Sequence, residues 1–255
     1  MTLHPLAERF AAVAEEYERG RPDYPPAVIA AIATELRLGA DARVLDLAAG
    51  TGKLTRALLA SGLDVIAVEP QAALRAPLAA SIGAERVLEG LAEAIPLPDA
   101  SISAVTVADA IHWFDHAVAL AEIARVLQDG AGLAIVTTFP DWSSASWVRE
   151  VGTLLADLRP LHPQFDGPPW QDAVRASGAW NEPREVRLTI SIPANPRRIV
   201  DHIASFSWIA ALDERERGAL LARLLAVIEA GETPREMPVQ VVLGLTELKP
   251  TGRTA

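Results

Sequence analysis

Short apolar runs alternate with amphipathic stretches along the first 140 residues. Uninterrupted runs of branched residues are typical of buried strands. They predict strands at 44–47, 64–68, 86–89, 103–108 and 130–138. The amphipathic stretches predict helices at 6–18, 27–36, 53–60, 71–81 and 116–127. Strands that alternate with helices in this way indicate an α/β fold with a parallel sheet.

The pattern is less regular after residue 140. It predicts a helix over 144–158, a proline-rich loop over 159–170, helices over 196–206 and 213–230, and strands at 184–192 and 239–248. No internal repeat or low-complexity segment interrupts the chain. At 255 residues we expect a single domain, with residues 140–235 forming a less regular region on the substrate side.

The most informative stretch is RVLDLAAGTGKLTR at residues 43–56. A predicted strand runs into Ala48, Gly50, Thr51 and Gly52, whose small size allows a tight turn and a close ligand. A helix follows at once, and open α/β sheets bind ligands between a strand end and a helix N-terminus. The loop lacks the GxxxxGK[ST] pattern of a phosphate-binding loop, and the third glycine of G-x-G-x-x-G is replaced by Thr55.

Two carboxylates accompany this loop. Asp46 lies in the end of the strand before it, which suits a cation better than a pyrophosphate. Glu69 follows the next predicted strand, nineteen residues after Gly50, where an acid that binds ribose hydroxyls is expected. A nucleoside with a cationic tail and no phosphate fits both acids, and S-adenosylmethionine is such a molecule.

The segment VLDLAAGTGKLT…VIAVEP resembles the first two motifs of class I S-adenosylmethionine-dependent methyltransferases. The family usually has D/E-x-G-x-G-x-G, whereas this chain has Ala48 at the first glycine. The resemblance covers residues 10–150 well and the remainder loosely. It implies a Rossmann-like, doubly wound, seven-stranded sheet, mostly parallel with the last strand antiparallel and with helices on both faces.

The N-terminal segment over residues 1–26 contains Y-E-R-G-R-P-D-Y-P, which is similar to a stretch that covers the cofactor in one methyltransferase subgroup. The resemblance implies that Tyr17 and Arg21 touch the methionine carboxylate. The alternative is a solvated turn in which Tyr24 packs on the sheet.

Residues 90–99, GLAEAIPLPD, are similar to the family's adenine-side motif, with Leu91 where many members have an acid. The resemblance then implies that the Leu91 side chain packs on the adenine ring and that backbone groups of Leu91 and Ala92 recognise the adenine. Glu93 is expected to be an acid at a helix start. The full set of expected cofactor-binding residues is Tyr17, Arg21, Asp46, Ala48, Gly50, Thr51, Gly52, Thr55, Glu69, Pro70, Leu91, Ala92 and Ala108.

The second informative stretch, Asp109 to His116, follows the fourth predicted strand and contains H-W-F-D, as in the same subgroup. His112 is the candidate general base, since histidine titrates near neutrality. The alternative is that it hydrogen-bonds a neighbour and only shapes the pocket, because methyl transfer often needs only proximity and orientation. Asp115 is expected to cap the next helix. His112 and His116 stand four apart, but no third ligand is evident, so we expect no metal.

Aromatic side chains are expected at the acceptor. Five of the six tryptophans lie after residue 140, and tryptophan is seldom left exposed. With His112, the expected substrate contacts are Trp113, Trp142 and Trp147. Their apolar character favours a small organic molecule; the identity of the acceptor, and whether O, N or C is methylated, stay open.

Composition narrows the remaining possibilities. The chain has 23 basic and 33 acidic side chains, a net charge of −10, which argues against a DNA or RNA partner. Without cysteine there is no disulfide, thiolate metal site or cysteine nucleophile. No apolar run reaches membrane-spanning length and the first residues resemble no secretion signal, so we expect a cytoplasmic protein with no membrane partner. The oligomeric state stays open.

Two rival functions remain. A nicotinamide-dependent oxidoreductase has the same kind of sheet, but Thr55 and Asp46 argue against it. A non-catalytic protein that binds a nucleoside is the other, because Ala48 and Leu91 depart from the family pattern.

Overall fold

The computed structural model describes the chain except residues 1–3, 9–11, 142–145, 157–162, 231–235 and 251–255. The chain divides into two compact units. The first contains Met1–Pro22, Thr138–Asp166 and Thr189–Gln240, and the second contains Asp23–Thr137, Gly167–Leu188 and Val241–Ala255.

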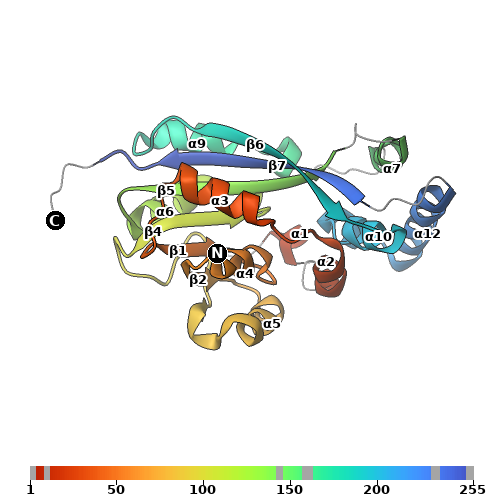
Figure 1. Ribbon diagram of the computed structural model, residues 1–255, viewed down its shortest axis with the longest axis horizontal. Coiled ribbons are helices and arrows are strands. Elements are labelled where there is room, and N and C mark those ends of the chain that lie inside the picture. Colours follow the sequence, from red (N-terminus) through yellow and green to blue (C-terminus); the bar gives the residue numbers. More distant parts are fainter. Residues whose placement is uncertain (1–3, 9–11, 142–145, 157–162, 231–235, 251–255) are drawn as a thin grey trace. The chain divides into compact units, whose positions relative to one another are not determined.

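Seven strands form one sheet in the order β3-β2-β1-β4-β5-β7-β6 (Figure 1). Their bounds are β1 Arg43–Leu47, β2 Asp64–Val68, β3 Val87–Leu88, β4 Ile102–Ala108, β5 Leu127–Pro140, β6 Arg184–Pro193 and β7 Glu236–Glu247. The pairs β1–β2, β2–β3, β1–β4 and β4–β5 are parallel. All seven strands coincide with runs predicted from the sequence, which confirms a seven-stranded α/β sheet.

The last strand runs against its neighbours. The Asp141 N–H donates to Pro238 O at 3.0 Å, and the Leu248 N–H donates to Ala131 O at 2.9 Å. The C-terminal end of β5 therefore lies beside the start of β7, and the N-terminal part of β5 lies beside the C-terminal end of β7. On the other side, Thr189 bonds Gln240 while Trp180 pairs with Leu248 in antiparallel fashion. The prediction of an antiparallel last strand is confirmed.

The helices of the second unit are α3 Pro26–Glu35, α4 Lys53–Ala60, α5 Ala72–Ile82, α6 His116–Val126 and α9 Trp170–Ser177, with 3-10 turns η2 Ala84–Arg86 and η3 Ile111–Trp113. α3 begins at Pro26, one residue before the predicted start of this helix, because proline suits the first position of a helix. The sequence pattern did not predict α9, which has only eight residues between proline and glycine.

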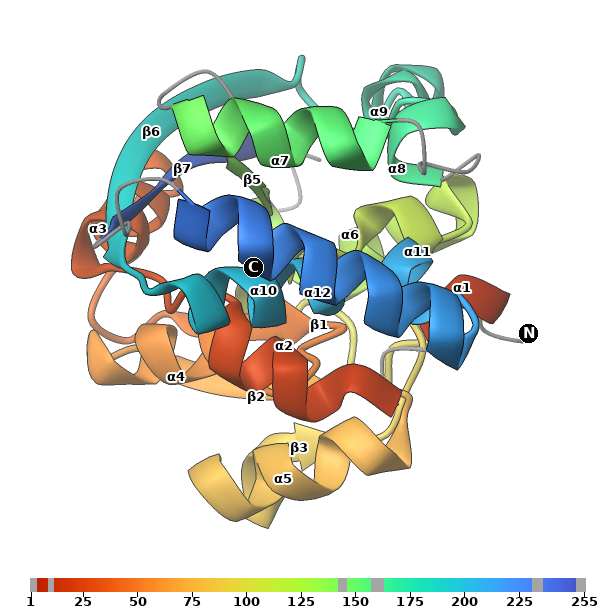
Figure 2. The ribbon, with the colours of Figure 1, turned by 90° about the vertical axis from the view of Figure 1, so that its right-hand side faces the viewer.

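The helices of the first unit are α1 Pro5–Glu8, α2 Ala14–Gly20, α7 Ser146–Ala156, α8 Pro163–Asp166, α10 Pro196–Ala204, α11 Ser207–Ala210 and α12 Glu214–Ala230. The single helix expected over 6–18 is represented by two separate helices, α1 and α2. The helix expected over 196–206 ends at Ala204, and α11 follows it. The loop expected over 159–170 contains α8. Within this unit α2 packs on α10, and α10 packs on α12 (Figure 2).

The core of the second unit is built from alternate residues of its central strands. Leu45 and Leu47 of β1, with Val105 and Val107 of β4, lie in one buried cluster that includes residues of α6 and α9. All but the first residue of β1 are buried, which is why its sequence is an unbroken apolar run apart from Asp46. This centre fixes where β1, β2 and β4 end, and the predicted residues Asp46, Glu69 and Ala108 lie in or next to those ends.

Candidate functional site

The backbone after β1 turns through three residues with positive φ. Ala48, Gly50 and Gly52 have φ of 57°, 58° and 87°. Such angles are easy for glycine and cost about 1–2 kcal/mol for other residues. The replacement of the family's first glycine by Ala48 therefore leaves the left-handed backbone in place and adds strain. The Ala49 N–H donates to Val68 O at 3.1 Å, which ties the turn to the end of β2.

The two glycines of the loop meet different surroundings. A Cβ at Gly52 would lie 2.3 Å from Leu78 Cδ1, so this glycine allows α5 to approach the start of α4. A Cβ at Gly50 would meet nothing within 4 Å. The backbone beside Gly50 thus borders open space, as a loop that receives a ligand requires.

Glu69 connects the end of β2 to this loop. Its carboxylate accepts the N–H of Gly50 at 2.9 Å and the N–H of Gln71 at 2.8 Å, and the residue is 3% exposed. Burial raises the pKa of Glu69, although both backbone N–H groups and Arg75 act in the opposite direction. The predicted pair of Gly50 and Glu69 is therefore brought together at one place.

Arg75, which the sequence analysis did not single out, fixes the backbone around this acid. Its guanidinium donates to the carbonyls of Glu69 at 3.0 Å and Pro70 at 2.8 Å, and it pairs with Glu89 at 2.6 Å. The only sequence signal for this role of Arg75 was a basic residue in the first turn of the helix that follows β2.

Asp46 lies beneath the loop and is fully buried. Thr55 Oγ1 donates to one carboxylate oxygen at 2.5 Å, and Thr106 Oγ1 lies 3.2 Å from the other. Burial raises the pKa of Asp46 to about 6 despite these two hydroxyls. Asp46 and Thr55, both predicted at the cofactor, thus form a hydrogen-bonded pair that joins β1 to α4.

Thr51 supplies a test of whether the loop suits a polar ligand. Its side-chain hydroxyl is buried and has no hydrogen-bond partner. A buried hydroxyl without a partner is unfavourable by roughly 1–3 kcal/mol. A polar group of a bound molecule beside Thr51 would remove this deficit, so the loop fits the expected nucleoside with its amino-acid tail.

Hydrogen bonds connect the loop over residues 90–99 to α6. Glu122 accepts the N–H of Ile95 at 2.9 Å, and Arg125 donates to the carbonyls of Ile95 and Leu97, each at 2.8 Å. Ala92 is buried while Leu91 is partly exposed. Glu122 and Arg125 were not predicted from the sequence, in which their spacing of three on one helix was the only signal.

The segment around His112 is held at both ends. Asp109 has a φ of 49°, and its N–H donates to Val136 O at 2.8 Å. Asp115 accepts the N–H of Val118 at 3.3 Å, which confirms the predicted cap of α6. Between them the rings of His112 and Trp113 lie 4.4 Å apart, and both residues are partly exposed. His116 Nε2 lies 3.1 Å from Ile111 O, a separate environment from that of His112.

Glu93 joins the two loops just described. Its carboxylate accepts the N–H of Asp115 at 2.9 Å. In a capping box that N–H is bonded by the third residue of the helix itself, which here is Val118 and cannot accept. The prediction that Glu93 stands at a helix start is wrong, because Glu93 lies in a turn and its carboxylate instead accepts from the residue before α6.

Tyr17 and Arg21 belong to the first unit. The Arg21 guanidinium carbon lies 5.4 Å from the centre of the Tyr17 ring and 5.2 Å from that of Phe206, and Arg21 Nε donates to Ser205 Oγ at 3.1 Å. Two expected substrate contacts lie outside the description: Trp142 among the undescribed residues, and Trp147 by its side chain.

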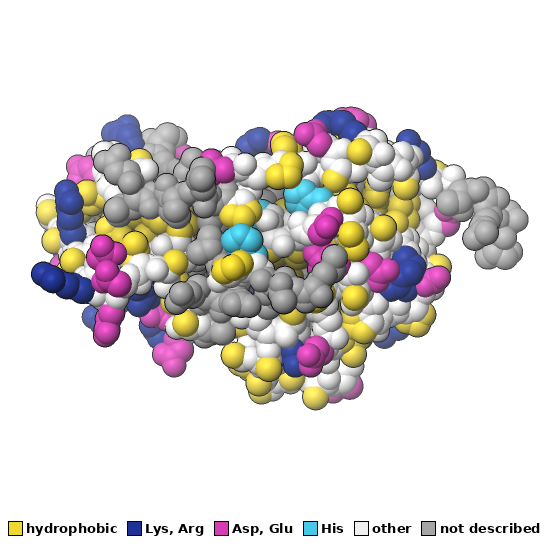
Figure 3. All heavy atoms as spheres, turned by 180° about the vertical axis from the view of Figure 1, so that it is seen from behind, with side chains coloured by type: hydrophobic (Ala, Val, Ile, Leu, Met, Phe, Trp, Pro, Cys, Tyr) yellow, Lys and Arg dark blue, Asp and Glu magenta, His cyan; other side chains and the backbone are white. Residues whose placement is uncertain are grey.

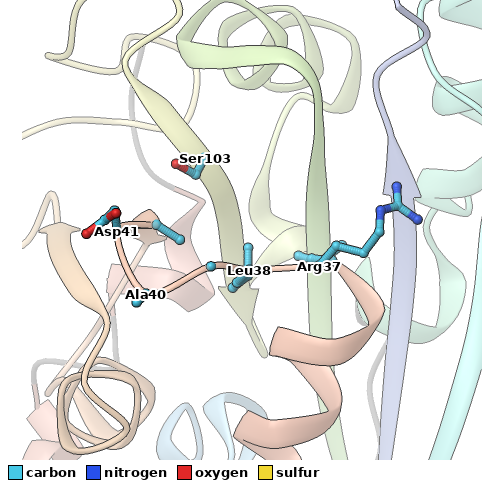
Figure 4. Close-up of a pocket in the computed structure, with 8 residues that line it drawn as sticks. Arg37, Leu38, Ala40, Asp41 and Ser103 are labelled. Carbon is cyan, nitrogen blue, oxygen red and sulfur yellow. The ribbon is translucent and has the colours of Figure 1, made fainter.

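A hollow of about 270 Å³ lies at the opposite end of β1 from the glycine loop (Figure 4). It is lined by residues 36–42 and Ser103. None of the predicted site residues lines it. On the molecular face in Figure 3, acidic and basic side chains are intermixed among the described residues. No described helix is both long and apolar enough to cross a membrane.

Known proteins resemble this chain in sequence and in fold. A family model described as a methyltransferase domain matches residues 45–135. An uncharacterised methyltransferase of Mycobacterium tuberculosis is 38% identical over 215 residues, covering 84% of this chain and 83% of its own. A solved structure from Anaeromyxobacter dehalogenans, described as a type II methyltransferase, has a TM-score of 0.65 at 25% identity and covers 90% of this chain and 97% of that one.

A phosphoethanolamine N-methyltransferase from Haemonchus contortus, in complex with phosphomonomethylethanolamine and S-adenosylhomocysteine, has a TM-score of 0.56 at 14% identity. The match covers 98% of this chain and 61% of that one. At this identity the match shows a shared fold.

Proposed function

Because the chain belongs to the S-adenosylmethionine-dependent methyltransferases, we propose that it transfers the methyl group to an O, N or C atom of a small organic molecule. The enzyme class follows from the family, whereas the acceptor and the roles of individual residues are our proposal. The observation that carries the proposal is Glu69, which is buried at the end of β2 and bonded to Gly50 of the adjacent loop.

The proposed cofactor-binding site is formed by the residues at the ends of β1, β2 and β4. Gly50 and Gly52 bring the loop backbone close to the amino-acid end, and the unpartnered Thr51 hydroxyl bonds to a polar group there. Glu69 accepts from the ribose hydroxyls, with Pro70 beside it, and Asp46 supports the loop from below through Thr55. The remaining members of the proposed site are Ala48, Leu91 and Ala92 on the adenine side, Ala108 at the end of β4, and Tyr17 and Arg21 at the methionine carboxylate.

When bound, S-adenosylmethionine supplies a sulfonium methyl group whose leaving thioether is neutral. The chain's own contribution is alignment, exclusion of water and, where the acceptor needs it, removal of one proton. His112 Nδ1 or Nε2 receives that proton, and Trp113 packs against the acceptor. The side-chain cap of Asp115, and the hydrogen bond that its N–H donates to Glu93, keep this segment in one conformation relative to α6.

The remaining features of the proposal follow from the family pattern. The two compact units work as one methyltransferase domain, in which residues 1–26 cover the cofactor and residues 140–235, with Trp142 and Trp147, contribute to the substrate side. Helices lie on both faces of the sheet. The protein acts in the cytoplasm on a small molecule and uses neither nucleic acid nor a membrane as a partner.

Isothermal titration of the purified protein with S-adenosylhomocysteine and with NADH tests this proposal. We expect binding of S-adenosylhomocysteine and none of NADH. Glu69→Ala removes an acceptor of charge-assisted bonds, so affinity should fall about 10- to 100-fold. Glu85→Ala, an exposed acid of the same unit, is the matched control and should bind as the parent does. Binding of NADH instead, or unchanged affinity in Glu69→Ala, would refute the assignment.

A further inference from the structure

The segment between β3 and β4 takes its shape from hydrogen bonds to α6. Residues 89–101, all of which the structure describes, contain no helix or strand. Pro96 and Pro98 also have no N–H group to donate. An irregular segment loses conformational entropy when it adopts one conformation, so contacts from other elements must hold it there.

Arg125 of α6 donates five hydrogen bonds, as many as a guanidinium group has N–H donors. One bond goes to Ile95 O and one to Leu97 O, each at 2.8 Å. The others go to the Asp99 carboxylate and to both carboxylate oxygens of Glu122, also at 2.8 Å. Because the group is planar and each donor has an acceptor, the loop is held in distance and in direction.

Glu122 completes this network one turn earlier in α6. Its carboxylate accepts the Ile95 N–H at 2.9 Å in addition to the bonds from Arg125. The N–H and the C=O of Ile95 are therefore both bonded to α6, and the Ile95 side chain is buried. The hydrogen bond from Arg125 lowers the pKa of Glu122, which keeps this carboxylate charged at neutral pH.

The anchored residues adjoin the part of the loop that is assigned to adenine. The Ala94 N–H donates to Leu91 O at 3.1 Å, which closes a turn over residues 91–94 immediately before Ile95. Leu91 and Ala92 have apolar side chains, so only their backbone N–H and C=O groups can bond the edge of a base. The direction of these backbone groups depends on how the turn is held.

We propose that Arg125 and Glu122 are positioning residues that give the cofactor-binding site its selectivity for adenine. They act through Ile95 and Leu97 on the turn over residues 91–94. This inference rests on the proposed function, in which the base of the cofactor lies against that turn. Hydrogen bonds weaken steeply when their geometry is poor, so a turn that moves loses its preference for adenine over a base with a different edge.

Three variants separate this role from a general effect on the fold. Arg125→Lys keeps the positive charge but replaces the fork of five donors by one ammonium group. Glu122→Gln keeps an oxygen that accepts from the loop and removes the negative charge opposite Arg125, so it should act in the same direction to a smaller extent. It also serves as the test if Arg125→Lys does not fold. Arg175→Lys is the matched control, because the ion pairs of Arg175 are with Asp172 and Glu182.

Isothermal titration with S-adenosylhomocysteine and with S-inosylhomocysteine, which has an oxygen in place of the adenine amino group, measures the selectivity. The dissociation constant of S-inosylhomocysteine divided by that of S-adenosylhomocysteine should be about 10 to 100 in the parent. It should fall below about 3 in Arg125→Lys and stay unchanged in Arg175→Lys. A general loss of stability weakens both ligands alike and leaves this ratio unchanged. A parent ratio near one, or a ratio that neither Arg125→Lys nor Glu122→Gln lowers, overturns the inference.

Hydrogen exchange of the Ala94 amide in the ligand-free protein tests the structural step separately. Arg125→Lys should speed this exchange about 10-fold, whereas Arg175→Lys should leave it unchanged. Exchange that is unchanged in Arg125→Lys also overturns the inference. A parent protein that binds neither ligand refutes the proposed function itself. That result is distinct from failure of this inference alone, in which the parent binds S-adenosylhomocysteine but its selectivity does not depend on Arg125 or Glu122.

Discussion

The substitution Asp46→Asn should stabilise the protein at neutral pH. The Asp46 carboxylate is fully buried, and burial raises its pKa from 3.8 to about 6. An asparagine has nearly the same shape, carries no charge, accepts from Thr55 through its amide oxygen and donates to the hydroxyl of Thr106 through its amide nitrogen. The variant therefore keeps both contacts and removes a desolvated charge.

The size of the effect follows from the pKa. A raised carboxyl pKa means that the folded state binds the proton more tightly. Stability from this group is present below pH 3.8 and is lost as the pH rises through about 6. The difference of about 2.2 between the pKa values of the folded and unfolded states corresponds to about 3 kcal/mol of stability lost above pH 6. We expect Asp46→Asn to exceed the parent in free energy of unfolding by about 3 kcal/mol at pH 7.5 and by about 1 kcal/mol at pH 4.5.

Urea denaturation monitored by tryptophan fluorescence at pH 4.5, 6.0 and 7.5 measures these differences. Asp41→Asn, an exposed aspartate just before β1, is the control and should change the free energy of unfolding by less than about 0.5 kcal/mol. A variant that is no more stable than the parent at pH 7.5, or an advantage that does not shrink with falling pH, refutes the reasoning.

The same substitution separates stability from function. Asp46 contributes negative charge beneath the loop, so its loss should weaken binding of cationic S-adenosylmethionine more than that of neutral S-adenosylhomocysteine. The dissociation constant of S-adenosylmethionine divided by that of S-adenosylhomocysteine, both measured by calorimetry, should therefore rise in Asp46→Asn. An unchanged ratio would mean that Asp46 acts on the fold alone.

Three further outcomes follow from the structure. Gly52→Ala should lower the free energy of unfolding by at least about 1 kcal/mol more than Gly50→Ala in urea titrations, because both have positive φ but only the former meets Leu78; equal losses would contradict this. Glu93→Ala should speed hydrogen exchange of the Asp115 amide, and Glu93→Gln should restore protection through its amide oxygen; exchange that is unaffected in both would exclude Glu93 as the acceptor. Since the pKa of His202 is lowered in the folded state, its contribution to stability is intact above about pH 6.5 and declines as the pH falls below that value. His202→Phe should flatten this part of the profile of unfolding free energy against pH, and an unaltered profile would show that another group titrates there.

Local signals in the sequence were sufficient for the centre of the fold. An unbroken apolar run placed β1, the glycines placed the turn, and Asp115 before an amphipathic stretch placed the start of α6. These features depend on residues within a few positions of one another, where propensity and backbone geometry act directly.

Features that depend on distant partners were not predictable. Glu93 accepts a hydrogen bond from Asp115, twenty-two residues away, and Thr106 donates one to Asp46, sixty residues away. No periodicity in the sequence reveals contacts between residues so far apart. His202 lies in an amphipathic helix of ordinary appearance, and the close approach of Gly20 to the His202 backbone joins residues far apart in the sequence. The start of β5 was also missed: the β4–β5 pairing is irregular between Ile102 and Ala104, so the strand begins before its apolar run.

A crystal structure of the protein with S-adenosylhomocysteine tests the central claim most directly. We predict that the molecule lies against the Gly50–Gly52 loop, with a ribose hydroxyl within hydrogen-bond distance of the Glu69 carboxylate and a polar group beside the Thr51 hydroxyl. A molecule bound elsewhere on the chain, or a ribose that does not reach Glu69, would contradict the account.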